Sequence, residues 1–493
     1  MQEPTIESMP SSLPSESTNT TPGRKVFVET WGCQMNVADS EKMLGILGSG
    51  GYETTTDVGE ADLVLLNTCH IREKARQKVL SRLGVLRGLK EKRPGMQIAV
   101  AGCVAQAEGN RLINAAPQID VLLGPGRIDT LPELLDRARS TGKSAIATGF
   151  KREKHHDHVH DEADQNGTSA HSESAETIAP AVVGPNLSGK NEITRFVTII
   201  QGCNNYCTFC VVPFTRGSEI SRPALEIKAE VRAMLATGAR EIMLLGQNVN
   251  SWGLDFVQGA QGAQAQDGSA FVNLLQQVAS EPDLLRLRFT TSNPHDFTPA
   301  LANLFASEPK LGRYMHLPVQ SGDDRILGLM KRKVTVAEYR ERIAWLRAAV
   351  PDIAISTDLI VGFPGETEAE FENTLALVEE VGFAFSYSFK YSPRKNTVAA
   401  RMPNQVPEDV MDRRLARLIA LQDQITTAQH EQEIGRDRAV LFTYESRKEA
   451  GVFYGRTEHY RLVRVNAARN LTGTVQMVKI TGGNKTALVG ELS

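Results

Sequence analysis

The run RFVTIIQGCNNYCTFC, residues 195–210, joins an apolar, strand-like segment directly to three cysteines. Helical patterns such as AEYRERIAWLRAAV at 337–350 then alternate with further strand-like runs at 241–248, 285–293, 313–322, 354–366 and 385–392. This alternation predicts a parallel sheet with right-handed crossovers, and six such units predict a full or partial barrel. Ligands bind at the carboxyl ends of the strands in such folds, so we expect the cysteine loop at the mouth of the barrel.

The loop supplies three cysteines, Cys203, Cys207 and Cys210, where most cysteine metal sites have four ligands. Zinc would need a fourth protein ligand, yet no histidine lies within forty residues after Cys203 and no cysteine follows Cys210. An iron–sulfur cube held by three thiolates leaves one iron open for a substrate or cofactor. The spacing, directly after a strand, therefore indicates an open and catalytic iron–sulfur centre.

Strand-like runs that end in a cysteine also occur three times near the N-terminus. KVFVETWGC, ADLVLLNTC and QIAVAGC end at Cys33, Cys69 and Cys103, at intervals of 36 and 34 residues. Each interval fits one βα unit, and parallel strands share their carboxyl edge. We therefore expect the three thiols to meet at one site that holds a second cluster. The alternative, three unrelated buried cysteines that pack as small apolar residues, is disfavoured by their equivalent positions.

Composition limits the class of protein. At 493 residues the chain is expected to form two or three domains. It has no apolar run of about 18 residues or more, and its N-terminal stretch lacks the basic and apolar regions of a signal peptide. We therefore expect a cytoplasmic protein with no membrane partner. Its six cysteines are then better explained as metal ligands or catalytic groups than as disulfides.

The C-terminal segment has a different pattern and charge. From residue 436, short alternating strands separated by Gly and Asn turns predict a small five-stranded β-barrel. This segment has ten Lys or Arg residues against five Asp or Glu residues, while the whole chain has a net charge of -3. A basic module on a near-neutral body indicates a polyanionic partner. The candidate RNA contacts are Arg456, Arg461, Arg464 and Lys479, with Tyr454 and Tyr460 for stacking.

These patterns define the domain organisation. We expect a disordered tail at 1–23, a cysteine-bearing domain at 24–140, a disordered His- and acid-rich linker at 151–188, the barrel domain at 189–428 and the small β-barrel at 431–493. A polar stretch at 256–268 is expected to be a long loop. The linker holds five of the ten histidines, and we favour a solvated linker over a metal site because a flexible tract offers no fixed geometry.

Several long motifs resemble one enzyme family. CNNYCTFC at 203–210 resembles the cysteine motif of the radical S-adenosylmethionine enzymes. ETWGCQMNVADSEKM, LLNTCHIREKARQKV, VAGCVAQAEG, TRGSEISRP and HLPVQSG resemble the methylthiotransferase subgroup, and the C-terminal segment resembles its RNA-binding TRAM module. The resemblance covers nearly all of residues 24–493 except the linker and the 256–268 loop. It implies an α/β protein with an N-terminal parallel, flavodoxin-like βα domain, a partial (β/α)6 radical-SAM barrel and a TRAM-like barrel.

The same resemblance implies cofactors, partners and a reaction. It implies two 4Fe-4S clusters, with S-adenosyl-L-methionine as both methyl donor and radical source. Cys203, Cys207 and Cys210 would hold the cluster that chelates the cofactor, and Cys33, Cys69 and Cys103 would hold the auxiliary cluster. The expected reaction is methylthiolation of C2 of N6-isopentenyladenosine beside the anticodon of tRNA, carried out by a monomer. The expected partners are the anticodon loop, a flavodoxin- or ferredoxin-like electron donor and a sulfur donor of unknown identity.

Four further residues are candidates for the cofactor site. Phe209 would shield the cluster or touch the cofactor adenine, with local packing as the alternative. Gly246 and Gln247 follow the second strand, where many radical enzymes of this kind have Gly-Gly-Glu for the cofactor amino group. Gly362 would admit the adenine beside the fifth strand, or it is a turn glycine that needs positive φ.

Several alternatives stay open at this point. Arg216 and Arg222 are candidate phosphate or cofactor contacts, against the commoner fate of a solvated arginine. The methylthio group would alternatively go to an aspartate of a ribosomal protein or to threonylcarbamoyl-adenosine in tRNA. A protein of another class, a non-enzymatic iron–sulfur or zinc protein, would bind metal without any reaction.

Overall fold

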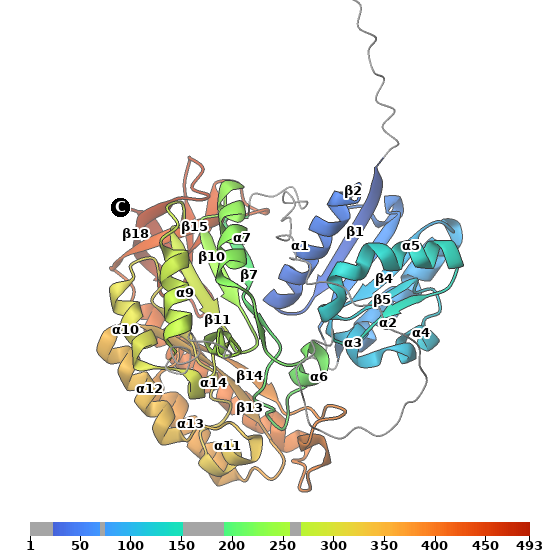
Figure 1. Cartoon of the computed structure of the whole chain (residues 1–493). Helices are drawn as coiled ribbons and strands as arrows, with labels where there is room; N and C mark the ends of the chain where they lie inside the picture. The colour runs from blue at the N-terminus through green and yellow to red at the C-terminus, as the bar shows by residue number, and fades with distance from the viewer. Residues whose placement is uncertain (1–22, 70–73, 151–191, 257–267) are drawn as a thin grey trace, which may run out of the picture.

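The computed structural model describes residues 23–69, 74–150, 192–256 and 268–493. The expected tail, the expected linker and most of the 256–268 loop lie outside the described residues. The described chain forms an N-terminal α/β unit, a barrel-like unit and a small C-terminal β-barrel (Figure 1). The predicted fold class is confirmed. No helix in the described part of the chain is long and apolar enough to cross a membrane.

The N-terminal unit is a doubly wound parallel sheet. Its strand order is β2-β1-β3-β4-β5-β6, which contains the 2-1-3-4-5 order of flavodoxin-like folds. The strands are β1 (Arg24–Trp31), β2 (Tyr52–Thr54), β3 (Leu63–Thr68), β4 (Gln97–Ala101), β5 (Val121–Leu123) and β6 (Ala145–Ala147). The helices are α1 (Gln34–Ser49), α2 (Lys74–Lys92), α3 (Cys103–Glu108), α4 (Asn110–Ala115) and α5 (Leu131–Thr141). Residues of α1 and α5 pack on one face of the sheet, and residues of α2, α3 and α4 pack on the other.

The second unit contains the six strands that the sequence predicts, arranged as two parallel sheets, β11-β10-β7 and β12-β13-β14. The strands are β7 (Thr194–Thr198), β10 (Glu241–Leu245), β11 (Arg286–Thr290), β12 (Tyr314–His316), β13 (Ala354–Val361) and β14 (Phe385–Lys390). An isolated parallel bridge, Leu287 to Leu311, joins the first sheet to the segment that leads into β12. A short antiparallel pair, β8 (Ile200–Gln201) and β9 (Ile220–Ser221), brackets the cysteine loop. The helices are α6 (Val212–Arg216), α7 (Ala224–Ala236), α9 (Ser269–Ala279), α10 (Pro299–Ser307), α11 (Asp324–Met330), α12 (Val336–Ala349), α13 (Glu368–Val381) and α14 (Glu408–Glu431).

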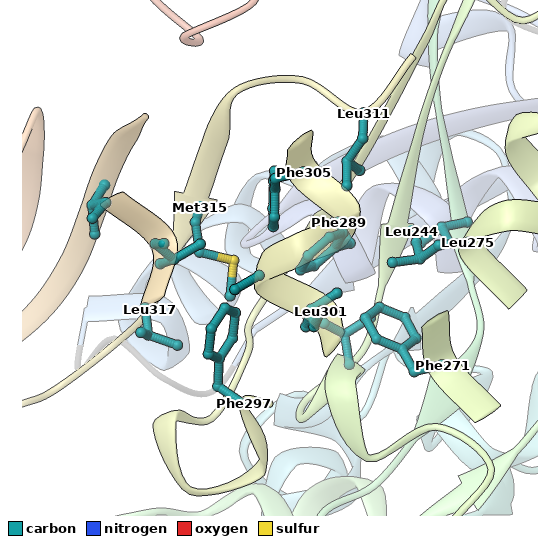
Figure 2. Packing of buried hydrophobic residues seen from close by; sticks show 14 of the residues in the cluster. Leu244, Phe271, Leu275, Phe289, Phe297, Leu301, Phe305, Leu311, Met315 and Leu317 are labelled. Atoms are coloured by element: carbon teal, nitrogen blue, oxygen red, sulfur yellow. The ribbon is translucent and has the colours of Figure 1, made fainter. Parts of the chain in front are cut away.

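The outward faces of these strands carry the main core. Leu244, Phe289 and Met315 point from β10, β11 and β12 toward Phe271 of α9 and Phe305 of α10 (Figure 2). Because side chains alternate along a strand, the residues between them face the inside of the barrel. These inner residues are more polar and include Glu241, Arg286, Arg288, Tyr314 and His316, all buried.

The C-terminal unit is a closed barrel with the order β15-β16-β17-β19-β18. Its strands are β15 (Asp437–Glu445), β16 (Val452–Thr457), β17 (Leu462–Asn466), β18 (Val475–Gly483) and β19 (Leu488–Leu492). The turn between β16 and β17 reaches the inner face of the larger unit. There the Tyr460 ring stacks on Tyr314, with centroids 4.6 Å apart, and Arg288 donates to the carbonyl oxygens of Thr457 and Glu458. The two barrels therefore share a buried, polar interface.

Candidate metal centres

The C-terminal cysteine triad lies on the loop between β8 and β9. Gly202 follows β8 with a φ of +83°, and its N–H donates to Gln247 Oε1 at 2.6 Å. Gln247 itself follows β10, so this bond ties the loop to the neighbouring strand. A Cβ atom at Gly202 would lie 1.9 Å from the carbonyl oxygen of Ser218. The approach of the two sides of the loop therefore requires glycine at this position.

Gly202→Ala is expected to remove the C-terminal cluster while leaving the N-terminal one. The left-handed conformation alone costs an alanine about 1–2 kcal/mol, and the contact with the Ser218 carbonyl adds a clash that separates β8 from β9. Iron per chain after anaerobic reconstitution is expected to fall from about eight to about four atoms. Gly328→Ala in α11 is the matched control, since its Cβ would meet nothing within 4 Å. An unchanged iron content in Gly202→Ala would contradict the argument.

The three thiols of this loop have donors aimed at their sulfur atoms. The N–H of Val212 lies 3.4 Å from Cys210 Sγ, Asn205 Nδ2 lies 3.6 Å from Cys203 Sγ, and Arg332 Nη1 lies 3.6 Å from Cys207 Sγ. Burial nevertheless raises the pKa of Cys203 to about 11 and that of Cys210 to about 12. Cys203 and Cys210 would therefore remain protonated until a metal displaces the protons, which is the usual coupling of metal binding to thiol ionisation.

The N-terminal triad sits at the carboxyl ends of three adjacent strands. Cys33 is the N-cap of α1 after β1, Cys69 follows β3, and Cys103 opens α3 after β4. A hydrogen bond from Cys69 is the largest cause that lowers the pKa of Cys33, to about 6, and the positive charge of Arg216 adds to it. Burial raises the pKa of Cys103. The N–H of Cys69 donates to the carbonyl oxygen of Trp31 at 2.9 Å, so Cys69 lies beside the turn that carries Cys33. Helix α6, which ends at Arg216, packs against α3, which begins at Cys103.

The two triads border the same region of the barrel. Cys33 packs in a small cluster with Met35, Met243, Leu245 and Phe196. The last three come from the inner faces of β10 and β7. Strand β7 leads through β8 into the C-terminal cysteine loop, and Gln247 after β10 is bonded to that loop. The carboxyl ends of the N-terminal sheet therefore open toward the mouth of the barrel.

The donor sets fit iron–sulfur clusters with one open iron. No group of three His, Cys, Asp or Glu side chains in the described ranges is arranged around a single metal ion. In a cube each thiolate binds a different iron, so the sulfur atoms need not converge on one point. Two buried polar atoms, Asn248 Oδ1 after β10 and Ser292 Oγ after β11, have no hydrogen-bond partner among the described residues and lie at the same edge of the barrel. Glu219 connects this edge to the cysteine loop, because it accepts from the N–H of Asn204 at 3.2 Å and from Asn248 Nδ2 at 3.5 Å. These groups suit a polar ligand beside the cluster.

The weaker cofactor candidates are placed as follows. Phe209 packs against a local cluster with Met330 and Phe363, which matches the packing alternative. A Cβ atom at Gly246 would lie 2.5 Å from Ile200, so this glycine serves close strand packing. Gly362 has a φ of +73°, and its missing Cβ points at Met411 of α14, 2.2 Å away, which matches the turn alternative.

The candidate RNA residues divide into engaged and exposed side chains. Arg461 donates to the carbonyl oxygen of Gln429 in α14 at 2.9 Å, so it is engaged within the protein. The Arg456 guanidinium covers the Tyr460 ring at 4.1 Å. Arg464 pairs with Glu449 at 2.7 Å and is partly exposed, and Lys479 is exposed. Lys479 is thus the most exposed of the four, and Arg464 and Arg456 are partly exposed.

Several arginines of the site lie in surroundings that differ from those the sequence predicts. Arg332, 7% exposed, contacts the sulfur of Cys207, and nothing in its surroundings KRK distinguishes it from a surface arginine. Arg216 is buried rather than solvated, because it is paired with Asp39 of α1. Arg222 pairs with Glu230 at 2.6 Å and donates to the carbonyl oxygen of Thr198 at 2.7 Å, so its guanidinium makes its contacts within the barrel domain.

Comparisons with known proteins agree with this geometry. Residues 25–124 match the uncharacterized protein family UPF0004, and residues 197–378 match the radical SAM superfamily. A solved structure, the radical S-adenosylmethionine methyltransferase TsrM from Kitasatospora setae with cobalamin and a 4Fe-4S cluster bound, has the same fold with a TM-score of 0.53. At 15% identity, the match covers 77% of this chain and 74% of that chain.

Sequence relatives are much closer. A tRNA-2-methylthio-N(6)-dimethylallyladenosine synthase from Cereibacter sphaeroides is 43% identical over 468 residues, covering 95% of this chain and 98% of the relative. Proteins with the same name from Maricaulis maris and Pseudomonas paraeruginosa are each 45% identical, over 475 and 446 residues, and cover 97% and 92% of those chains. They cover 95% and 89% of this chain. The chain therefore belongs to the family of the tRNA-2-methylthio-N(6)-dimethylallyladenosine synthases, which are radical S-adenosylmethionine enzymes.

Proposed function

We propose that this protein methylthiolates C2 of N6-isopentenyladenosine beside the anticodon of tRNA. One observation carries the proposal: Cys33 of the N-terminal triad packs against β7 and β10. The first of these strands leads through β8 into the loop of Cys203, Cys207 and Cys210, and Gln247 after the second accepts a hydrogen bond from Gly202 of that loop. Two cluster sites that border one opening allow a single bound base to meet a radical source on one side and a sulfur source on the other. The names of the relatives support this choice of substrate.

The proposed cofactors follow from the two donor sets. Cys203, Cys207 and Cys210 would hold a 4Fe-4S cluster that binds S-adenosyl-L-methionine, and Cys33, Cys69 and Cys103 would hold a second one. When bound, these groups supply the radical chemistry and the sulfur, which no side chain of the chain can supply itself. Gln247 and Gly202 position the first loop. Asn248 and Ser292 would offer the cofactor polar atoms that have no partner in the part of the chain that the structure describes.

The small barrel would bind the tRNA. On its outer surface Tyr444 and Tyr454 stack with centroids 5.2 Å apart, and Arg464 lies opposite Tyr454 on the next strand. Exposed aromatic rings with an adjacent cation suit stacking on unpaired bases and contact with phosphates. The target base must leave its own stack to reach the mouth of the larger barrel. We place the enzyme in the cytoplasm with its tRNA, as a monomer supplied with electrons by a flavodoxin- or ferredoxin-like protein.

The proposal is tested by nucleoside mass spectrometry. The chain is expressed in a bacterial strain that lacks its own enzyme for this step, and bulk tRNA is digested. We expect the methylthio form of isopentenyladenosine to appear and the amount of isopentenyladenosine without the methylthio group to fall. A variant with Ala at Cys203, Cys207 and Cys210 should give neither change. Unchanged isopentenyladenosine would refute the substrate. A new methylthio mass on threonylcarbamoyl-adenosine or on a ribosomal protein would then identify the alternative.

A further inference from the structure

Arg216 of the barrel domain points into the N-terminal domain. It is the last residue of α6, the short helix that follows the C-terminal cysteine loop. Its side chain is 4% exposed, and its Nη2 donates to Asp39 Oδ2 of α1 at 2.7 Å. Figure 1 shows α6 between the two domains, beside α3. A permanently charged group is therefore buried where the two domains meet.

The surroundings of Arg216 contain the N-terminal thiols. Cys103 opens α3, and Asp39 lies on the helix whose N-cap is Cys33. Helix α3 packs against α6, so Arg216 at the end of α6 lies between the helices that begin at Cys33 and at Cys103. The buried guanidinium is therefore held beside the carboxylate of Asp39 and next to the elements that carry two of the three thiols.

Domain docking alone does not account for this arrangement. A buried ion pair costs several kcal/mol of desolvation per ion, so a purely structural contact gains little from it. A second buried ion pair, Arg195 to Glu41 at 3.4 Å, already joins α1 to β7 of the barrel. No described interaction relates Arg195 to a cysteine. Both arginines join the two domains, but only Arg216 lies near the thiols. A comparison of the two therefore distinguishes an effect on domain docking from an effect on the thiols.

We propose that Arg216 is a positioning residue for the auxiliary cluster: held by Asp39, its guanidinium supplies the positive charge that stabilises the anionic, thiolate-bound group on Cys33, Cys69 and Cys103. Because α6 follows the other cysteine loop, the same side chain fixes the spacing between the two cluster sites. The inference rests on the proposed function, which assigns a cluster to the N-terminal triad. Net charge and hydrogen bonds near the sulfurs are main determinants of cluster potentials.

The test uses the full chain with Cys203, Cys207 and Cys210 replaced by Ala, so that the auxiliary cluster is the only one. Arg216→Met, Arg216→Lys and Asp39→Asn are compared with Arg195→Met and Glu41→Gln in this background. Iron content, the rate of iron loss to a chelator and the midpoint potential are measured after anaerobic reconstitution. Arg216→Met is expected to shift the potential to more negative values and to speed iron loss, since the reduced cluster carries more negative charge. Asp39→Asn is expected to shift the potential the opposite way.

The outcomes separate the inference from the proposed function. A parent protein that binds no iron would refute the auxiliary cluster and, with it, the inference. A parent that binds about four irons, with Arg216→Met indistinguishable from Arg195→Met, would refute the inference alone. If Arg216→Met binds no iron, the iron content of Arg216→Lys is the deciding measurement. Iron binding restored by Lys supports a role of the positive charge, and a Lys variant that also binds no iron refutes that role. Unchanged values in Arg195→Met and Glu41→Gln are expected.

Discussion

Replacement of Cys203, Cys207 and Cys210 by Ala is expected to abolish both the cleavage of S-adenosylmethionine and the methylthio product. The barrel has no other thiol to offer a cluster, because the three remaining cysteines of the sequence lie in the N-terminal domain. Radical chemistry on an aromatic C–H bond has no substitute among protein side chains. Formation of 5′-deoxyadenosine should therefore fall by a factor of roughly a thousand or more, to background. Iron should fall from about eight to about four atoms per chain.

The opposite triad is the matched control. Ala at Cys33, Cys69 and Cys103 also removes three thiols and about four irons, but it leaves the barrel loop and its bond from Gly202 to Gln247 intact. This variant should still form 5′-deoxyadenosine while it makes no methylthio nucleoside. Both products are measured by mass spectrometry in single-turnover reactions with a chemical reductant. Stoichiometric zinc with little iron in the parent protein would contradict the two-cluster assignment.

The strands of the larger domains were predictable because each is an apolar run with a clear end. All six runs of the barrel contain a strand, from β7 to β14. The predicted runs are longer than the strands where a turn follows: the run at 354–366 ends as β13 at Val361, since Gly362 takes a positive φ. The short N-terminal strands β2, β5 and β6, each of three residues, have too few residues to show an alternating pattern.

The cysteines of the candidate site were predictable, whereas the charged groups around them were not. Residues that follow parallel strands lie at the same edge of the sheet. The spacing of the three N-terminal cysteines along the sequence therefore indicates that they lie near one another. The fate of an arginine depends on partners that are distant in sequence. Arg216 is buried because Asp39 lies on another domain, and Arg461 is engaged because Gln429 lies beside it on α14. Local sequence does not reveal either partner.

The interface between the two barrels should be the most sensitive point for stability. Arg288 is buried, with 1% of its side chain exposed, and it donates to Glu241 Oε1 at 2.7 Å and to the carbonyl oxygens of Thr457 and Glu458. Arg288→Met leaves a buried carboxylate and two carbonyl groups without this donor. Loss of one partner of a buried ion pair typically costs about 3–5 kcal/mol. At about 2 °C per kcal/mol for domains of this size, we expect the calorimetric midpoint to fall by about 6–10 °C.

The same variant should reverse the pH dependence that Glu241 contributes. Burial raises the pKa of Glu241, but Arg288 and then Arg286 outweigh burial, so the pKa lies below its usual value. In the parent protein this carboxylate therefore stabilises the fold above the unfolded pKa of about 4.3, and that stability is lost as the pH falls through the folded pKa. In Arg288→Met burial dominates and raises the folded pKa, so stability is fully present below about pH 4.3 and is lost as the pH rises through the folded value. The loss of unfolding free energy in the variant should thus be larger at neutral pH than near pH 4.

Arg313→Met, which removes an exposed pair with Asp352 at 3.1 Å beside the same interface, is the control and should cost less than about 1 kcal/mol. A deficit that is equal at both pH values would show that Arg288 acts through packing and not through the charge of Glu241.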